Sequence, residues 1–109
     1  MMETKNATIT GAYLSIADRG ILEGWISLDY GNSSQGFGGY ALYVPRQPER
    51  KSTAGHFIFR VMQVAGVKAW HELPGKTIRV QADSTKVHRI GHILNEDWFD
   101  PAVDFAAFN

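Results

Sequence analysis

Apolar and polar side chains alternate between residues 21 and 30, and this pattern limits the fold of the chain more than any other feature. Leu22, Ile26 and Leu28 fall on one side of an extended backbone. A period of two is typical of a β-strand with one buried face. The preceding segment, residues 8–16, is also rich in β-forming residues, and a turn containing glycine separates the two. The sequence therefore predicts a β-hairpin at the start of the fold.

The periodicity changes in the middle of the chain. Residues 35–44 continue the β-pattern and predict a third strand. A polar loop with two prolines follows at residues 45–53 and ends this strand. Apolar side chains then recur at every third or fourth position over residues 55–65, which predicts a helix with one buried face. Gly66 stands where a glycine cap commonly ends a helix.

Two more strands and a short helix complete the predicted order. Residues 77–82 and 87–94 are rich in β-forming residues around a polar turn, and Pro101 can occupy the first position of a terminal helix. The order βββ-α-ββ-α indicates one α+β domain over residues 1–109, with a C-terminal tail at 96–109. We expect a mostly antiparallel sheet of about five strands with helices packed on one face.

The charges of the chain are unevenly distributed although they sum to zero. Residues 1–45 carry −2, residues 46–95 carry +6 and residues 96–109 carry −4. A protein that holds nucleic acid needs an uncompensated positive surface. The distribution therefore argues against a nucleic-acid partner and favours a small, enclosed ligand.

Three features of the sequence limit the cellular compartment and the chemistry that we expect for this chain. The chain has no cysteine, which excludes disulfides, thiolate metal sites and cysteine nucleophiles. No stretch approaches the roughly 20 apolar residues that span a bilayer, and the polar start has no signal-peptide core. We therefore expect a cytoplasmic protein without a membrane partner.

The segment Gln35-Gly36-Phe37-Gly38-Gly39-Tyr40 is the most unusual in the chain, because strand interiors normally disfavour glycine. Its spacing fits neither a Walker loop nor a dinucleotide fingerprint. One interpretation is a bare backbone that a flat ligand or another chain approaches closely, with Phe37 and Tyr40 stacking on it. The other interpretation is a bulged strand that packs tightly under a helix.

Basic residues give further candidates for anion binding. Free amides at the start of the predicted helix attract anions, and Arg60, one turn into that helix, adds charge. The alternative there is an ordinary Ser/Thr cap beside a solvated basic loop. Arg79 together with Lys86 or Arg89 could line a basic groove on the second hairpin, or these residues could belong to solvated strand faces.

The end of the chain mixes aromatic, amide and acidic residues. Trp98 or Phe99 could stack on a base while Asn95 reads its edge, and the alternative is a plug for the core. His88 and His92 share one face of their strand, but no dense cluster of ligands surrounds them, so we expect no metal and no cofactor.

Six strings between Ile9 and Pro101 resemble a family of small phage proteins. They are Leu28-Asp29-Tyr30-Gly31, Gln35 to Tyr40, Gly55 to Arg60, Trp70 to Val80, Ile90-Gly91-His92-Ile93 and Asp97-Trp98-Phe99. On these strings the chain resembles the first-described class of phage Thoeris anti-defence proteins. Members of that family bind the cyclic ADP-ribose isomers that Thoeris TIR enzymes make as alarm signals, and they sequester the messenger without cleaving it. Some members are implied to hold cyclic oligonucleotides at a second site in a larger oligomer.

The resemblance implies a non-enzymatic counter-defence protein in the host bacterial cytoplasm. A cyclic ADP-ribose calls for aromatic stacking, amide hydrogen bonds and cationic partners for its pyrophosphate. The ligand-binding residues that we expect are Gln35, Gly36, Phe37, Gly38, Tyr40, Arg60, Arg79, Arg89, Asn95, Trp98 and Phe99. Enclosing such a ligand is hard for 109 residues, so we expect a homodimer or higher homo-oligomer. The tail residues that would build its interface are Phe99, Val103, Phe105 and Phe108.

Two other functions remain open from the sequence. His88, His92 and nearby acids would suit a small hydrolase of cyclic nucleotide signals. A direct protein inhibitor of a host defence enzyme would act through its own surface and would need no small molecule.

Overall fold

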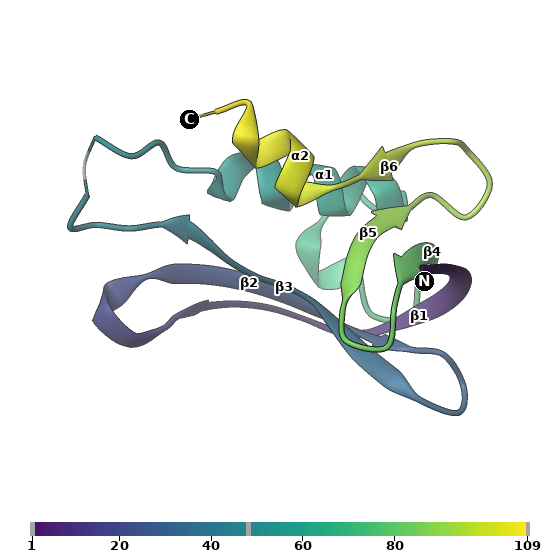
Figure 1. The fold of residues 1–109 in the computed structure, drawn as a ribbon. Helices are drawn as coiled ribbons and strands as arrows, with labels where there is room; N and C mark the ends of the chain where they lie inside the picture. The colour runs from purple at the N-terminus through teal and green to yellow at the C-terminus, as the bar shows by residue number, and fades with distance from the viewer. Residues whose placement is uncertain (1, 48, 109) are drawn as a thin grey trace.

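The computed structural model describes residues 2–47 and 49–108 and shows an α+β fold in which helices pack on one antiparallel sheet (Figure 1). Met1, Pro48 and Asn109, the last two from the predicted loop and tail, lie outside the described residues. The sheet has six strands in the spatial order β3-β2-β1-β4-β5-β6. The elements are β1 (Glu3–Ile16), β2 (Leu22–Asp29), β3 (Ser34–Tyr43), α1 (Ala54–Ala65), β4 (Thr77–Ala82), β5 (Val87–Gly91), β6 (Trp98–Phe99) and α2 (Pro101–Ala106).

The predicted fold class is confirmed, and the strands differ in number and length. The sixth strand, β6, pairs Trp98 and Phe99 with the end of β5. Two residues are too few for a period of two to appear in the sequence. The predicted strand 87–94 ends at Gly91, because the His92 ring accepts hydrogen bonds from two following backbone amides and so turns the chain.

Strand β1 pairs with different partners through its two halves. Residues 3–8 pair with β4, and residues 8–16 pair with β2, with a register shift between Ile9 and Gly11. A bulge of this kind bends a strand and increases its twist. The sheet therefore curls, and the turn between β4 and β5 comes close to β3, which lies at one edge of the sheet (Figure 1).

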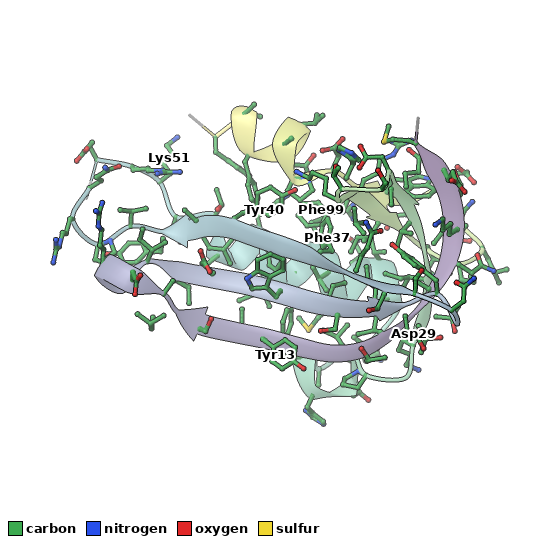
Figure 2. All side chains as sticks on the ribbon, turned by 60° about the horizontal axis from the view of Figure 1, so that its bottom comes forward. Tyr13, Asp29, Phe37, Tyr40, Lys51 and Phe99 are labelled. Carbon is green, nitrogen blue, oxygen red and sulfur yellow. The ribbon has the colours of Figure 1, made fainter. Side chains whose placement is uncertain are left out.

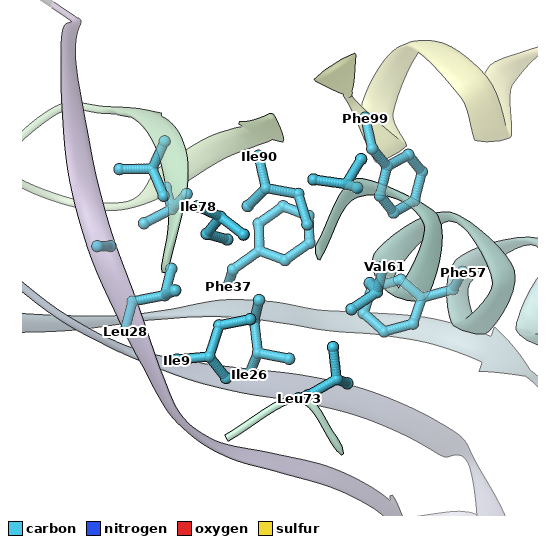
Figure 3. Packing of buried hydrophobic residues seen from close by; sticks show 14 of the residues in the cluster. Ile9, Ile26, Leu28, Phe37, Phe57, Val61, Leu73, Ile78, Ile90 and Phe99 are labelled. Atoms are coloured by element: carbon cyan, nitrogen blue, oxygen red, sulfur yellow. The ribbon is translucent and has the colours of Figure 1, made fainter. Parts of the chain in front are cut away.

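The core lies between the inner face of the curled sheet and α1 (Figure 3). Phe57, Val61 and Val64 form the buried stripe of α1, as the helical spacing predicts. Gly66 ends the helix in the left-handed conformation, with φ of 74°. The largest fully buried side chains of the sheet and tail are Ile9, Ile26, Leu28, Phe37, Leu42, Ile78, Ile90 and Phe99.

The tail folds back on its own chain. The carboxylate of Asp100 accepts hydrogen bonds from the first amides of α2 and so begins this helix. Phe105 packs edge-on against Tyr40, and Phe108 packs against His56. Together with buried Phe99, these contacts support the core-plug interpretation of the tail. No helix in the described part of the chain is long and apolar enough to cross a membrane.

Aromatic rings lie over glycines on the outer face of the sheet. Figure 2 brings forward this face of β1, β2 and β3, with Tyr13 on it. A Cβ atom at Gly91 would approach the Trp98 indole to 2.6 Å, and Trp25 covers Gly36 and Gly39 of the neighbouring strand in the same way. On the inner face, a Cβ at Gly24 would lie 2.7 Å from the Phe57 ring. The glycines therefore make room for large rings.

Two glycine substitutions should change stability in opposite directions. Gly24→Ala should destabilise the fold by about 1–3 kcal/mol, because the new methyl group overpacks against Phe57. Gly55→Ala should stabilise it by about 0.5 kcal/mol, because this helical position has open space around it and alanine favours the helix. Urea unfolding of both variants tests this, and equal midpoints would contradict the packing argument.

Candidate ligand-binding site

A hollow of about 370 Å³ lies between the edge of β3 and the turn that joins β4 to β5. Gln35, Gly36 and Gly38 line it, so three of the predicted site residues come together here. Its volume lies near the lower end of the range of small-molecule sites, about 300–1,000 Å³. The complete lining is Trp25, Gln35, Gly36, Gly38, Ser84, Thr85, Lys86 and Val87.

One wall of the hollow is the indole of Trp25. Trp25 pairs with Gly38 across the β2–β3 ladder, and a register shift beside this pair marks a bulge in which Gly38 and Gly39 have φ of 132° and 78°. The bulged strand packs under α1 on its inner face, where Phe37 stacks on Phe57, and under the Trp25 indole on its outer face, as the bulged-strand interpretation predicts. Trp25 is 39% exposed, so it is open in part for contact with a ligand.

The opposite wall is the β4–β5 turn, which the side chain of Asp83 holds together. Its Oδ1 accepts hydrogen bonds from the backbone N and Oγ1 of Thr85, at 2.8 and 2.6 Å, and from the backbone N of Lys86 at 3.0 Å. Its Oδ2 lies 2.7 Å from Nε2 of His88. Because these two turn amides are already bonded to Asp83, the ammonium of Lys86 is the cation that the lining offers to an anion.

Gln35 connects the two walls. Its Nε2 donates a hydrogen bond to the backbone oxygen of Asp83 at 3.1 Å, and its Oε1 accepts one from the hydroxyl of Tyr30 at 2.6 Å. Burial raises the pKa of Tyr30, so this hydroxyl keeps its proton at neutral pH. A second contact crosses the same gap, because Nζ of Lys86 lies 5.7 Å from the centre of the Tyr40 ring.

Tyr40 lies outside the lining but beside it. The ring is half-buried and packs edge-on against Phe37 and Phe105. Burial, and after it the charge of Asp100, raise the pKa of its hydroxyl. Tyr40 contacts Lys86 of the lining but does not line the hollow itself, so its predicted role in stacking on a ligand has no support there.

Two predicted stacking residues belong to the core. Phe37 and Phe99 have no exposed surface, and their rings lie 6.0 Å apart among other aromatic side chains (Figure 3). The prediction that they stack on a ligand is wrong, because other side chains cover their faces. Both are inward-facing positions of strands, where sequence periodicity reports burial and gives no information on ligand contact.

Two predicted cations are engaged within the chain. Nη2 of Arg60 lies 2.9 Å from a carboxylate oxygen of Asp97 and donates to the backbone oxygen of Trp98 at 2.7 Å. Arg79 donates to the backbone oxygens of His92 and Asn95, at 2.8 and 2.7 Å. Both arginines hold the loop between β5 and β6, and neither lines the hollow.

The remaining predicted residues gather on the outer face of β4, β5 and β6. The guanidinium carbons of Arg79 and Arg89 lie 4.9 and 4.8 Å from the centre of the Trp98 ring. Nε of Arg89 also donates to the side chain of Gln81 at 2.6 Å. Asn95 is exposed in the loop before β6. The structure therefore divides the predicted site into this cluster, the core aromatics and the hollow.

The sequence prediction missed four residues of the lining, Trp25, Ser84, Thr85 and Val87, and it named Lys86 only as a residue that could line a basic groove on the second hairpin. Trp25 carried a signal, because it is a large aromatic residue on the polar side of an alternating strand. Ser84 and Thr85 carried none that identifies a site, since their position near β3 depends on the curl of the sheet.

The histidines are engaged in local contacts. His56 lies 2.8 Å from Asp104 and ties α1 to α2, and His88 pairs with Asp83. The ring of His92 caps the loop that follows it. Within residues 2–47 and 49–108, no group of three or more His, Asp or Glu side chains is placed to hold a metal ion.

The Asp83 network predicts a dependence of stability on pH. Hydrogen bonds from Thr85 and then His88 hold the pKa of Asp83 well below its ordinary value of 3.8. A lowered carboxyl pKa stabilises the fold above the unfolded-state value, and this contribution is lost as pH falls below it. Asp83→Asn should therefore be less stable at pH 7 and should lose less stability than the wild type below pH 3.8. Urea midpoints across pH measure both effects, with exposed Asp18→Asn as the control, and superimposable wild-type and Asp83→Asn profiles would refute the prediction.

Comparison with family models, with curated proteins and with solved structures finds no match to this chain.

Proposed function

We propose that this chain is a phage counter-defence protein that binds and sequesters a cyclic ADP-ribose-type messenger in the host cytoplasm without degrading it. The observation that carries the proposal is the hollow itself, in which a partly exposed indole, Trp25, faces a turn that bears one lysine, Lys86. A flat base and an anionic pyrophosphate need these two kinds of contact within one small site.

Each part of such a ligand has a partner in the lining. The purine stacks on Trp25, which takes the role that the sequence analysis gave to Phe37. The pyrophosphate lies at the ammonium of Lys86. The hydroxyls of Ser84 and Thr85, in the same wall, form hydrogen bonds with the riboses. The hollow is small and open to solvent, which supports the expectation that a second copy of the chain completes the enclosure.

Binding without cleavage is supported by the state of the acid–base groups beside the hollow. The carboxylate of Asp83 accepts four hydrogen bonds, and its lowered pKa keeps it ionised, so it is a poor general acid. His88, on which the hydrolase alternative depends, is held by this carboxylate and does not line the hollow. These contacts favour a binding protein over a hydrolase.

Recovery of the ligand tests sequestration directly. The purified protein is incubated with a cyclic ADP-ribose isomer, free ligand is removed, and the protein is heat-denatured. The proposal expects the intact cyclic molecule in near-stoichiometric yield, measured by liquid chromatography and mass spectrometry. Linear ADP-ribose would identify a hydrolase, and recovery of no nucleotide would leave the direct protein inhibitor as the better explanation.

Substitutions in the two walls should weaken binding by comparable amounts. Trp25→Ala removes base stacking worth about 1–3 kcal/mol, so the Kd should rise about tenfold or more. Lys86→Gln removes the cation and should raise the Kd about tenfold, with a weaker dependence on salt. Isothermal titration calorimetry gives both values.

Two matched variants control for general effects. Tyr13→Ala removes the exposed ring directly opposite Trp25 on β1, and Lys68→Gln removes a lysine outside the hollow. Both controls should bind as the wild type does. A loss of affinity in Tyr13→Ala equal to that in Trp25→Ala would show that the hollow is not the binding site.

A further inference from the structure

The two walls of the hollow belong to distant parts of the sheet. Three strands separate β3 from β5 in the sheet order, and no backbone ladder joins the two among the described residues. Side chains make the connection: the hydrogen bond from Gln35 to Asp83, and the contact of Lys86 with Tyr40. These two contacts cross the gap at the hollow, beside the buried core that Phe37 of β3 shares with Val87 and Ile90 of β5.

The turn on one side of this gap is internally rigid. The Asp83 side chain fixes Thr85 and Lys86 through three hydrogen bonds, and the backbone N of Asp83 donates to the backbone oxygen of Lys86 at 3.0 Å. A turn braced in this way moves as a unit about its connections to β4 and β5. Any opening of the hollow on this side must break the bond from Gln35.

Gln35 is itself held in the orientation that this bond requires. Its side-chain oxygen accepts from the Tyr30 hydroxyl, which leaves the amide nitrogen directed at the backbone oxygen of Asp83. The side chain is half-buried, and its two partners come from different halves of the curled sheet. An amide that is oriented before a ligand arrives loses little freedom on binding.

We propose that Gln35 is a positioning residue that holds the β4–β5 turn against the edge of β3 and thereby sets how long a ligand stays in the hollow. The effect on the ligand rests on the proposed function, whereas the effect on the turn does not. Gln35 acts through Ser84 and Lys86, which the turn carries into the lining. Loss of the hydrogen bond from Gln35 to Asp83 should raise the dissociation rate of the ligand more than it lowers the association rate.

The test replaces the donor and keeps the size of the side chain. In Gln35→Glu the introduced carboxylate still accepts from Tyr30 but faces the backbone oxygen of Asp83 without a proton to donate. Dissociation of a cyclic ADP-ribose isomer, followed by stopped flow at pH 7, should be about five to ten times faster than from the wild type. Gln47→Glu makes the same change of charge on an exposed loop residue and should have no effect.

Acidification provides a readout that a purely structural defect would not show. A glutamate titrates near pH 4.3, and its protonated form regains a donor for the oxygen of Asp83. The excess dissociation rate of Gln35→Glu should therefore fall as the pH drops from 6, and about half of it should be lost near pH 4.3. The wild type measured over the same range corrects for the charged and titratable groups around the site, which are Tyr30, Asp83, Lys86 and His88.

A measurement without ligand separates this proposal from the proposed function. Relaxation dispersion of the backbone amides of residues 84–87 should be weak in the wild type and clear in Gln35→Glu. Gln35→Met loses both hydrogen bonds and should show the same dispersion. This variant replaces Gln35→Glu in the experiment if Gln35→Glu does not fold. If the wild type binds no nucleotide, the proposed function fails while the dispersion still decides the role of Gln35. Unchanged dispersion in a folded variant would overturn that role.

Discussion

The pairing of β1 with two different strands is the constraint on which the rest of the structure depends. One half of β1 joins the hairpin with β2 and β3, and the other half joins β4, β5 and β6. A flat sheet of this order would hold β3 and β5 far apart. The bulge in β1 bends the sheet, and the bend encloses the core against α1 and brings the β4–β5 turn to the free edge of β3. The core and the hollow thus follow from the same distortion.

Glycine and aromatic residues work together on this curved sheet. On the outer face Trp98 lies across Gly91, and Trp25 lies across Gly36. A ring that packs on bare backbone buries apolar surface without a helix above it. At β3 the Trp25 indole packs on the backbone and stays partly exposed near Lys86. The contact that stabilises the sheet therefore also forms one wall of the hollow.

The fold was predictable from local patterns to a much greater extent than the site. The alternation in β2 and the helical spacing in α1 identified both elements, because each reports which face is buried. Periodicity does not distinguish a core aromatic from a ligand contact, and for this reason the prediction that Phe37 and Phe99 contact a ligand is wrong. Periodicity also did not predict that Arg60 and Arg79 form hydrogen bonds with the loop before β6, because these bonds join residues that only the folded chain brings together.

By itself the sequence determined the α+β class, the three initial strands, the main helix and the unusual backbone at residues 36–39. Local propensity and periodicity decide these features, since they depend on neighbours within a few positions. The tertiary structure alone decided which residues share a site. It placed Trp25 opposite Lys86 and joined Gln35 to Asp83, 48 positions away, because the curvature of a sheet arises from the twist of all its strands together.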